Sequence, residues 1–384
     1  MLVADPGPLL YHSPISLGGL ATYAHHQASA LARCGCTVTV VASDDYAGKG
    51  PYEVHRLHPR RPVTPPYWPR LMTRAATFRL IVEQQRRFAG FARLSGVRHI
   101  LMGAYFEYAA PIWSPVYKRM RDDGFVFGAM VHDPVRDYVV GPAWWHRWSV
   151  SSGYSFLREA FVHSRITLET GARDNLRTTV VPHGPYRYPS TTLPRDEIRR
   201  ELQIPSTSVV LLSFGHIRDG KNLDLAIRAL PDFPMAYLLV AGGPPTPGNR
   251  PLSFYQNLAE CLGVGARCRW VAGYVPDAEV SNLFEAADIV LLTYNARFRS
   301  ASGVLNTAAS FRKLCLASSG DGDLRDAVEG YSLGQWVVPD SDDSFARGLQ
   351  SLSAAPPNPQ WDRYERDHSW EANARLVIDR MFAT

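Results

Sequence analysis

Two cationic side chains stand in a glycine-containing segment near the middle of the chain, at residues 214–222. Arg218 and Lys221 lie three positions apart there, downstream of Gly215. A guanidinium and an ammonium both bind phosphate oxygens through charge-assisted hydrogen bonds. Lys221 is one of four lysines among 41 basic residues, which favours a specific need for a compact ammonium. The segment therefore predicts a diphosphate site, and the alternative is a solvated basic turn.

The residues on either side predict the elements that position these cations. Residues 209–213 are a short apolar run, as in a buried parallel strand. After the segment, apolar residues recur at the spacing of an amphipathic helix: Leu223, Ala226, Ile227 and Leu230. We expect a strand–loop–helix corner, in which glycine allows a tight turn and the N–H groups of the helix start face an anion.

A second glycine segment lies near the N-terminus. Gly18 and Gly19 precede a helical repeat of apolar residues that ends at Gly35, and residues 37–41 then read as a strand. We expect the first strand at residues 2–4, followed by a loop that continues to the glycine pair. This order is typical of a doubly wound fold, and it places the pair where a helix N-terminus can meet a ligand.

Titratable side chains follow two further strand-like runs. Residues 125–131 lead directly into His132 and Asp133, and residues 178–181 lead to His183. Open α/β sheets bind ligands at the carboxyl ends of their strands. His132 could therefore position or deprotonate a hydroxyl, and the alternative is a capping histidine without chemistry. His183 either lines a cleft at a hinge or is simply packed there.

The length and the proline-rich segments predict two domains. A chain of 384 residues can build two hydrophobic cores. We assign residues 1–190 to an N-terminal domain, 195–360 to a second domain and 361–384 to a C-terminal helix, with a Pro- and Ser/Thr-rich linker at 188–194. The second domain is expected to be doubly wound, with strands at 209–213, 236–241, 268–272, 288–293 and 314–317.

The net charge of +5 is distributed unevenly. Residues 56–98 contain ten arginines and a single acid, Glu83, interleaved with aromatic and aliphatic side chains. This pattern fits either a basic amphipathic helix on an anionic membrane surface or a solvated helix face beside a core. Nucleic-acid binding is not expected, because no recognised module accompanies the charge.

The remaining composition is that of an ordinary globular protein. No apolar run reaches the length of a membrane-spanning helix, and the N-terminus lacks the pattern of a signal peptide, so we expect a cytoplasmic protein. The five cysteines match neither a disulfide framework nor zinc-ligand spacing and are expected to be reduced. Adjacent His25 and His26 point to different helix faces, so no metal site is expected there.

Taken together, these segments resemble the GT-B glycosyltransferases, in particular the large retaining family that includes sucrose and glycogen synthase relatives and phosphatidylinositol mannosyltransferase. The resemblance spans nearly the whole chain and rests on the order and spacing of its motifs. These motifs are Gly18-Gly19 and the stretches 214–222, 272–277, 286–294, 302–305 and 369–371.

The resemblance implies an α/β protein with two Rossmann-like domains facing a cleft and a final helix that crosses back to the first domain. The first domain would hold the acceptor and the second a nucleoside-diphosphate-sugar, which is a substrate, so no cofactor or metal is expected. Arg218 and Lys221 would bind the donor diphosphate, and His132 would contact the transferred sugar. The remaining donor-binding residues would be Gly18, Gly19, Gly215, His216, Gly273, Tyr274, Val275, Ser302, Gly303, Val304, Leu305 and Thr307.

The chain departs from the family pattern at one place. Family members commonly carry two glutamates around the helix that begins near residue 302, and these positions fall on Arg299 and Thr307. A carboxylate can accept hydrogen bonds from two ribose hydroxyls at once, which neither residue can do. Asn306 or Thr307 could supply a neutral substitute. His216 likewise replaces an arginine that is frequent at its position, and Arg218 is the expected stand-in.

The leading hypothesis is a retaining, metal-independent glycosyltransferase of polysaccharide or glycoconjugate biosynthesis. No side chain stands out as a covalent nucleophile, so the family implies same-face attack on the sugar. The acceptor would be a carbohydrate, a lipid-linked glycan at the inner face of the cell membrane or a soluble secondary metabolite. Trp144, Trp145 and Trp148 could stack on an acceptor sugar or could serve packing. Alternatives are a sugar-nucleotide 2-epimerase and a degenerate transferase that only binds a sugar nucleotide or glycan.

Overall fold

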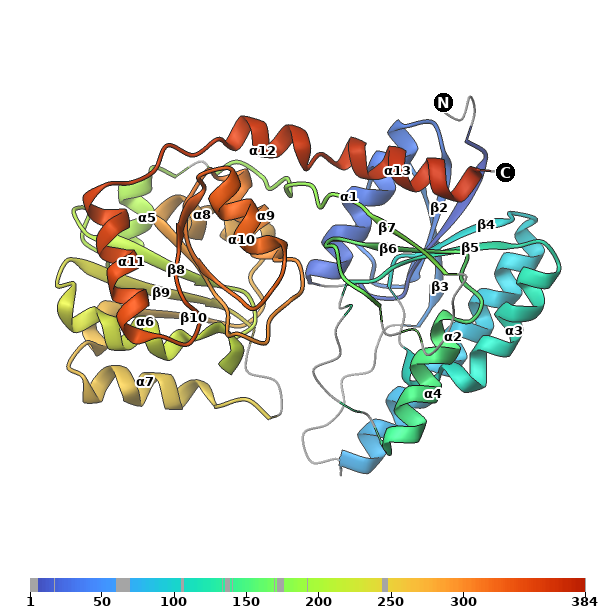
Figure 1. Cartoon of the computed structure of the whole chain (residues 1–384), viewed down its shortest axis with the longest axis horizontal. Coiled ribbons are helices and arrows are strands. Elements are labelled where there is room, and N and C mark those ends of the chain that lie inside the picture. The colour runs from blue at the N-terminus through green and yellow to red at the C-terminus, as the bar shows by residue number, and fades with distance from the viewer. Residues whose placement is uncertain are drawn as a thin grey trace. The chain divides into compact units, whose positions relative to one another are not determined.

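The chain divides into two compact α/β units in the computed structural model (Figure 1). Unit 1 comprises residues 1–183 and 369–384, and unit 2 comprises residues 184–368. The structure describes residues 6–16, 18–59, 70–104, 107–132, 134, 139, 141–168, 170, 176–191, 193–243 and 248–383. The strand expected at residues 2–4 lies outside the described residues, as does Asp133.

Unit 1 contains a seven-stranded parallel sheet with the strand order β3-β2-β1-β4-β5-β6-β7. The strands are β1 (Pro8–Ser13), β2 (Thr37–Ser43), β3 (Glu53–His58), β4 (His99–Met102), β5 (Val126–Met130), β6 (Glu159–Val162) and β7 (Arg177–Val180). The expected strands at 37–41, 125–131 and 178–181 are confirmed by β2, β5 and β7.

Two strands of unit 1 correct the sequence interpretation. The segment that we expected to be a loop before Gly18 contains β1, whose residues from Leu9 to Ser13 are all buried. This central strand begins with a proline and ends with the polar residues His12 and Ser13, so the sequence lacks the apolar run that would have indicated a strand. The charged strand β3 was also missed, because it is an edge strand paired only with β2, so its side chains alternate less clearly.

Helices cover both faces of this sheet (Figure 1). One face packs against α2 (Arg70–Ser95), α3 (Ala110–Asp122) and α4 (Ala143–Tyr154), through buried rings such as Phe88, Trp113 and Tyr154. The other face carries α1 (Gly19–Arg33) and α13 (Trp370–Phe382). A short 3₁₀ turn, η1 (Glu107–Ala109), precedes α3.

The helix α13 is joined to α1 by a buried amide network. Asn373 is fully buried, and its Nδ2 donates to the carbonyl oxygen of Pro182 at 2.8 Å. The Gln27 amide donates to Asn373 Oδ1, also at 2.8 Å. In α13, Ala374, Val377, Ile378 and Met381 are buried at helical spacing.

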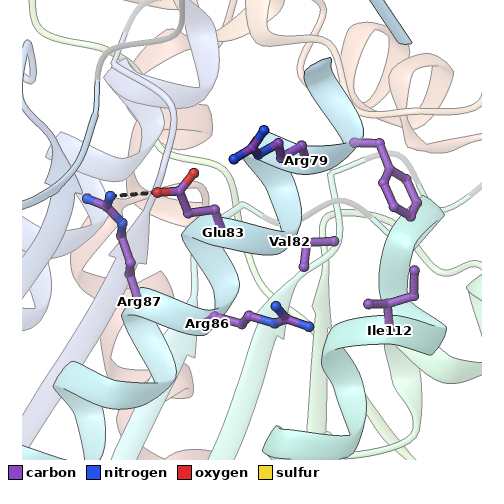
Figure 2. A pocket seen from close by; sticks show the side chains of 7 residues that line it. Arg79, Val82, Glu83, Arg86, Arg87 and Ile112 are labelled. Carbon is purple, nitrogen blue, oxygen red and sulfur yellow. Dashed lines mark hydrogen bonds and ion pairs between the residues drawn. The ribbon is translucent and has the colours of Figure 1, made fainter. Parts of the chain in front are cut away.

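The basic stretch 56–98 is helical only in part. Its first residues belong to β3, residues 60–69 lie outside the described residues, and α2 supplies the helix. A cavity of about 430 Å³ lies between α2 and α3 (Figure 2). It is lined by Phe78, Arg79, Val82, Glu83, Arg86, Arg87 and Ile112. Of the described residues, no helix is both long and apolar enough to cross a membrane.

Unit 2 contains a six-stranded parallel sheet with the order β10-β9-β8-β11-β12-β13. Its strands are β8 (Val209–Phe214), β9 (Ala236–Gly242), β10 (Cys268–Ala272), β11 (Ile289–Thr293), β12 (Leu314–Ser318) and β13 (Gly334–Trp336). The five strands expected here are confirmed, whereas the three-residue β13 was too short to show a pattern.

Helices again cover both faces of the sheet in unit 2. One face packs against α8 (Asp277–Ala286), α9 (Gly303–Ser310), α10 (Asp323–Gly330) and α12 (Trp361–Asp367). The other face packs against α6 (Leu223–Ala229), α7 (Leu252–Cys261) and α11 (Asp342–Ala354). The remaining elements are α5 (Arg195–Glu201), η2 (Asp219–Lys221), η3 (Leu230–Asp232) and η4 (Gly265–Arg267).

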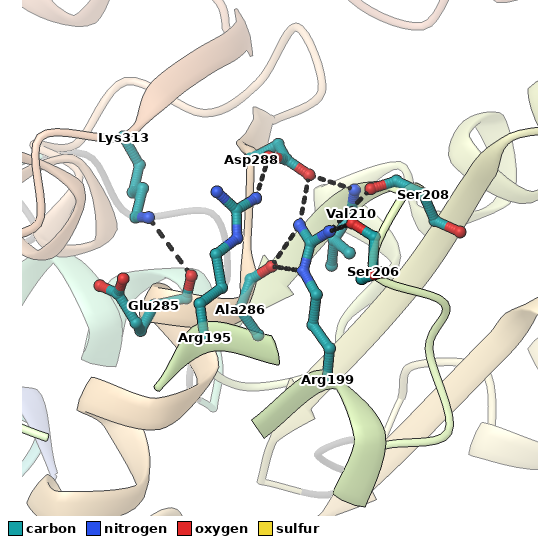
Figure 3. Close-up of polar contacts among 9 residues, drawn as sticks. All are labelled: Arg195, Arg199, Ser206, Ser208, Val210, Glu285, Ala286, Asp288 and Lys313. Carbon is teal, nitrogen blue, oxygen red and sulfur yellow. Dashed lines mark hydrogen bonds and ion pairs between the residues drawn. The ribbon is translucent and has the colours of Figure 1, made fainter. Parts of the chain in front are cut away.

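A carboxylate at the start of β11 ties α5 to the sheet (Figure 3). Asp288 accepts hydrogen bonds from Arg195, from Arg199 at 2.7 Å and from the Val210 amide at 2.7 Å. Arg199 is only 2% exposed and also donates to backbone carbonyls, including that of Ala286. Because a buried guanidinium needs a countercharge, Asp288 has a structural role.

Candidate donor and acceptor sites

The loop after β8 is held against the end of β9. Gly215, with φ +92°, donates its amide to the Ala241 carbonyl at 2.8 Å, and Ile217 donates to that of Gly243 at 3.1 Å. A Cβ at Gly242 would lie 2.1 Å from the Gly215 carbonyl oxygen. No side chain fits there, so Gly242 allows the two backbones to approach this closely.

Lys221 lies inside this turn. Its Nζ donates to the Phe214 carbonyl oxygen, and a Cβ at Gly215 would lie 3.0 Å from Nζ. The Lys221 side chain is half-buried, and its desolvation, together with the nearby Arg218 cation, lowers the pKa of Lys221 to about 7. The ammonium therefore lies beside the backbone of Gly215, and a bound anion would offset the cost of its desolvation.

Arg218 is exposed and stands over an aromatic ring. Its guanidinium carbon lies 5.6 Å from the centre of the Phe298 ring, which stacks on Tyr294 at 3.9 Å. The Tyr294 hydroxyl is 2.8 Å from Ser302 Oγ. Arg218 is thus positioned by the segment that follows β11, and no carboxylate of the described residues forms an ion pair with it.

The remainder of the loop is fixed by side chains that have structural roles. Asn222, with φ +51°, donates to Asp340 at 2.9 Å. Asp219 accepts from the Tyr255 hydroxyl at 2.8 Å and from the Arg250 amide at 3.0 Å. These contacts leave Arg218 and Lys221 as the cations of the turn, while His216 is exposed beside them, against Gly243.

The helix α9 begins where the sequence predicts, and Ser302 is its N-cap. Ser302 Oγ accepts a hydrogen bond from the Leu305 amide at 3.2 Å, so this hydroxyl caps the helix and also contacts the Tyr294 hydroxyl. Val304 Cγ2 would lie 3.9 Å from a Cβ at Gly215, which places the first turn of α9 beside the loop of Lys221. The amides of Gly303 and Val304 have no partner within the helix, because they belong to its first turn.

The two residues considered as substitutes for a ribose-binding glutamate both face inward. Thr307 is 2% exposed, and its hydroxyl lies 3.2 Å from the Gly303 carbonyl oxygen and 3.2 Å from the Tyr188 hydroxyl. Asn306 is 3% exposed and accepts from the Tyr364 hydroxyl at 3.0 Å. Their hydrogen-bonding groups are thus used inside unit 2, and Arg299 is exposed.

The segment after β10 lies at the same sheet edge. Gly273 has φ +130° and donates its amide to the Gly242 carbonyl at 2.9 Å. Tyr274 is 63% exposed, and Val275 packs against the core. An exposed aromatic ring at this edge could contact a flat ligand such as a nucleobase.

Unit 1 presents its own set of residues at the carboxyl ends of its strands. Gly18, with φ +80°, is the N-cap of α1, and a Cβ at Gly18 or Gly19 would meet nothing within 4 Å. His132 follows β5, and its Nε2 lies 3.0 Å from the Gly103 carbonyl oxygen. His183 is 9% exposed, with its ring 5.0 Å from that of Tyr23.

The predicted residues belong to two groups, one in each unit. Gly215, His216, Arg218, Lys221, Gly273, Tyr274, Val275 and the start of α9 share one sheet edge of unit 2. Gly18, Gly19, His132 and His183 lie at the corresponding edge of unit 1.

The sequence interpretation missed several residues of these edges. Gly242 and Gly243 end β9 and contact the cationic loop, and a glycine pair after an apolar run was a usable signal. Tyr294 and Phe298 support Arg218, which spacing alone could not show. His163, which follows β6, lies with its ring 5.7 Å from that of His132.

Known proteins resemble this chain in sequence over its second half and in fold over nearly its whole length. The sequence profile of the family described as "Glycosyl transferases group 1" matches residues 194–377. D-inositol 3-phosphate glycosyltransferase of Mycobacterium tuberculosis is 30% identical over 195 residues, which cover 48% of this chain. The same alignment covers only 39% of the length of that relative.

Solved structures show the same fold over the whole chain. Sucrose-phosphate synthase from Thermosynechococcus elongatus matches with a TM-score of 0.65 and 18% identity, covering 98% of this chain and 95% of that one. Anabaena HepE in complex with UDP-glucose matches with a TM-score of 0.62 and 14% identity, with the same coverage. The chain therefore has the GT-B fold, and its residues 194–377 match the family described as glycosyl transferases group 1.

Proposed function

We propose that this protein is a glycosyltransferase, which moves a sugar from a nucleoside-diphosphate-sugar to a hydroxyl acceptor with retention of configuration. The observation that carries the proposal is the pair of cations after β8. Lys221 lies beside Gly215 and the first turn of α9, and Arg218 has no acidic partner among the described residues. Anabaena HepE, which shares the fold, has been solved with UDP-glucose.

In the proposed reaction, these cations stabilise the charge that develops on the departing diphosphate. Lys221 acts as a compact ammonium and Arg218 as a planar guanidinium, so no metal ion or separate cofactor is required. Amide groups at the start of α9 add hydrogen bonds to the phosphates or to sugar hydroxyls. The acceptor hydroxyl attacks on the face from which the diphosphate leaves, and the leaving phosphate takes its proton.

We assign the contact with the transferred sugar to His132. Its Nε2 is the donor to the Gly103 carbonyl, because a carbonyl oxygen can only accept. Gly18 and Gly19 leave open space at the start of α1, which lets a phosphate or sugar approach the backbone.

The donor would be held without a carboxylate at the position of the family glutamates. Thr307 and Asn306 are buried and bonded within unit 2. Exposed Tyr274 would stack on the nucleobase instead, and the neighbouring backbone of Gly273 and Val275 would form the surface against which the base lies. Recognition would thus depend on stacking and phosphate contacts more than on the ribose hydroxyls.

For the acceptor, we propose a carbohydrate that is lipid-linked at an anionic membrane surface, in polysaccharide or glycoconjugate biosynthesis. The cavity between α2 and α3 has an apolar lining of Phe78, Val82 and Ile112 (Figure 2). Arg87 is paired with Glu83 at 2.5 Å. Arg79 and Arg86, which also line it, form no ion pair within the described residues.

Such a lining fits an amphiphile with an anionic head group. Phe78 is 37% exposed and Ile112 41%, so the apolar surface is open to solvent. The proposal places the enzyme peripherally at the inner face of the cell membrane. A soluble secondary metabolite as acceptor is the alternative, in which the same arginines are only solvated.

A panel of nucleoside-diphosphate-sugars tests the donor. We expect one nucleotide to raise the melting temperature and its sugar nucleotide to be hydrolysed slowly, with the anomeric configuration retained in the first product. Conversion of the donor to its 2-epimer would identify an epimerase instead. Thermal stabilisation without any turnover would identify a binding protein.

Flotation with liposomes of anionic lipid at low salt tests the membrane surface. We expect the wild type to float and the double variant Arg79→Glu/Arg86→Glu to stay in the soluble fraction. The matched control is Arg347→Glu/Arg366→Glu, which makes the same charge change at exposed positions of unit 2. A wild type that stays soluble, with activity on water-soluble acceptors, would favour the secondary metabolite.

A further inference from the structure

Two tryptophan rings are exposed on the outer face of α4. Trp144 is 59% exposed and Trp148 is 51% exposed, and the two residues lie about one helical turn apart. Their ring centres are 6.4 Å apart and their ring planes differ by 28°, so the two indoles face nearly the same direction. Packing inside unit 1 does not account for rings that are this open to solvent, and two adjacent exposed rings indicate a surface that binds something.

The orientation of this pair is supported by contacts on both sides. The half-buried Trp145 ring meets Trp144 and Trp148 edge-on, with ring centres 5.9 and 5.4 Å away. On the inner side of α4, Ser149 is completely buried, and its hydroxyl donates to the Tyr108 carbonyl oxygen at 3.0 Å. This hydrogen bond fixes the rotation of the helix, so the two exposed rings stay on its outer face.

The pair lies at the carboxyl edge of the sheet of unit 1. The strands β5 and β6 are parallel neighbours, and α4 connects them. A helix in such a connection begins at the carboxyl end of the first strand, so the first two turns of α4 share a sheet edge with His132, which follows β5. The helix also packs on α3, whose first turn contains Ile112 of the cavity. The pair therefore belongs to the same edge as the residues that we assign to the acceptor and the transferred sugar.

The outer face of α4 has the chemistry of a carbohydrate-binding surface. A pyranose carries several C–H groups on one face of its ring, and these groups stack on the electron-rich face of an indole. Exposed Arg147 lies three positions after Trp144, and half-buried Ser151 lies three positions after Trp148, so each is a neighbour of one ring on the helix surface. Arg147 forms no ion pair with a described residue, and both side chains can bond to sugar hydroxyls.

The same face does not fit a membrane or a stable protein interface. Within α4 the one aliphatic residue larger than alanine is Val150, and it is buried. The two rings are thus not part of a continuous aliphatic stripe, which a membrane-bound helix or the core of a protein interface would need. A ligand with a small apolar face and many hydroxyls matches this surface better than either of them.

We propose that Trp144 and Trp148 form a stacking platform for a pyranose ring of the acceptor. The sugar ring lies against the two indoles, and Arg147 and Ser151 bond to its hydroxyls. This inference rests on the proposed function, in which the acceptor is a carbohydrate, and it assigns the side chains that hold that carbohydrate in unit 1.

Three double variants separate stacking from general apolar contact. Trp144→Leu/Trp148→Leu keeps apolar side chains but removes the aromatic faces, whereas Trp144→Phe/Trp148→Phe keeps smaller aromatic faces. The matched control is Met235→Ala/Val338→Ala, which removes two apolar side chains of unit 2 that are 55% and 61% exposed. Because all four positions are exposed, we expect each variant to keep a melting temperature close to that of the wild type.

The first readout is binding, which does not depend on activity. The probes are linear pentasaccharides of glucose, of mannose and of galactose, added to full-length protein labelled with 5-fluorotryptophan. We expect at least one of them to shift the fluorine-19 resonances of Trp144 and Trp148, which Trp144→Phe and Trp148→Phe assign, and to leave that of Trp336 in unit 2 unchanged.

The affinity for that pentasaccharide then distinguishes the variants. Its dissociation constant should rise about tenfold or more in Trp144→Leu/Trp148→Leu, and it should stay within about threefold of the wild type in the phenylalanine variant and in the control. The second readout is kinetic, with the same pentasaccharide as acceptor. In the leucine variant we expect KM for the acceptor to rise about tenfold, while KM for the sugar nucleotide changes by less than about twofold.

Resonances that no pentasaccharide shifts, or a leucine variant that keeps wild-type affinity, would overturn the inference. Shifts of the same two resonances with vesicles of phosphatidylcholine, and not with sugars, would identify a membrane contact and would also overturn it. A wild type that binds the pentasaccharide through these rings but transfers no sugar would refute the proposed function and would still establish the platform.

Discussion

The Nε2 atoms of His12 and His58 lie 3.0 Å apart, in a pair that is completely buried. His12 belongs to the central strand β1 and His58 ends the edge strand β3, so their side chains meet across β2. The His12 ring also packs on Phe88 of α2 at 4.2 Å. One ring must donate to the other, and the Nδ1 atom of each is buried without a partner in the described residues.

This pair makes the stability of unit 1 depend on pH. Burial and the neighbouring His58 lower the pKa of His12 well below its ordinary value, and burial and Arg87 lower that of His58 to about 4. The unfolded chain therefore takes up protons near pH 6.5, whereas the folded pair stays neutral until about pH 4. Stability is present above pH 6.5 and is lost as the pH falls, by at most about 3 kcal/mol for His58.

The urea midpoint measured between pH 7.5 and 4.5 checks this expectation. The variant His12→Leu/His58→Leu should show a weaker decrease of the midpoint on acidification than the wild type. His216→Ala removes an exposed imidazole outside the buried pair and is the control, so it should keep the wild-type dependence. Equal slopes in all three proteins would contradict the account of the pair.

Removing either donor-site cation should depress activity without unfolding unit 2. We expect Lys221→Ala and Arg218→Ala each to lower kcat/KM by about 100-fold or more, as is typical for a group that stabilises charge in the transition state. Lys49→Ala and Arg347→Ala change the same residue types at exposed positions and should keep wild-type rates. Wild-type kinetics in both site variants would show that the diphosphate binds elsewhere.

Donor binding should be coupled to proton uptake at Lys221. With its pKa lowered to about 7 by desolvation and Arg218, Lys221 loses its charge as the pH rises through 7. A bound diphosphate favours the ammonium and raises that pKa, so the affinity for the nucleotide should fall between about pH 7 and 9.

Calorimetry in two buffers with different ionisation enthalpies measures this uptake directly. At pH 8 we expect close to one proton to be taken up per nucleotide bound by the wild type. Lys221→Arg keeps a charge at all these pH values and should bind nucleotide with no such uptake. A wild type with no buffer dependence would mean that Lys221 is already charged in the free protein.

The sequence predicted the strands of unit 2 and the turn that holds Arg218 and Lys221, because each of these features produces a pattern among residues that are close together in the sequence. Apolar runs mark the buried strands of unit 2, and Arg218 and Lys221 stand in a turn of recognisable composition. The strand β1 was missed because its polar His12 and Ser13 are buried by partners that are distant in sequence. Burial of that kind is a property of the fold and leaves no periodic signal.

The histidine cluster shows the same limit at the level of the site. His132 and His183 could be proposed, since each follows a strand-like run, but the sequence does not show that the rings of His132, His163 and His183 all pack on Tyr23. Thr307 shows the converse. Its position matched that of a family glutamate, yet Tyr188 and the Gly303 carbonyl occupy its hydroxyl inside unit 2.

The contact between Gly242 and Gly215 gives a test of the donor loop that leaves every cation in place. Gly242 has φ +147°, and a Cβ there would lie 2.1 Å from the Gly215 carbonyl oxygen, so Gly242→Ala must displace the loop that holds Lys221. We expect a loss of stability of about 2 kcal/mol or more and weakened nucleotide binding in the protein that remains folded.

Gly248→Ala is the matched control for this variant. Gly248 also has a positive φ, +101°, but a Cβ there meets nothing within 4 Å. It should therefore incur a similar backbone strain without moving the loop, and it should bind nucleotide like the wild type. If both variants bound nucleotide equally well at a temperature where both are folded, the approach of β9 to Gly215 would not shape the donor site. Weaker binding in Gly242→Ala alone would show that the loop must rest on the end of β9 to present Lys221.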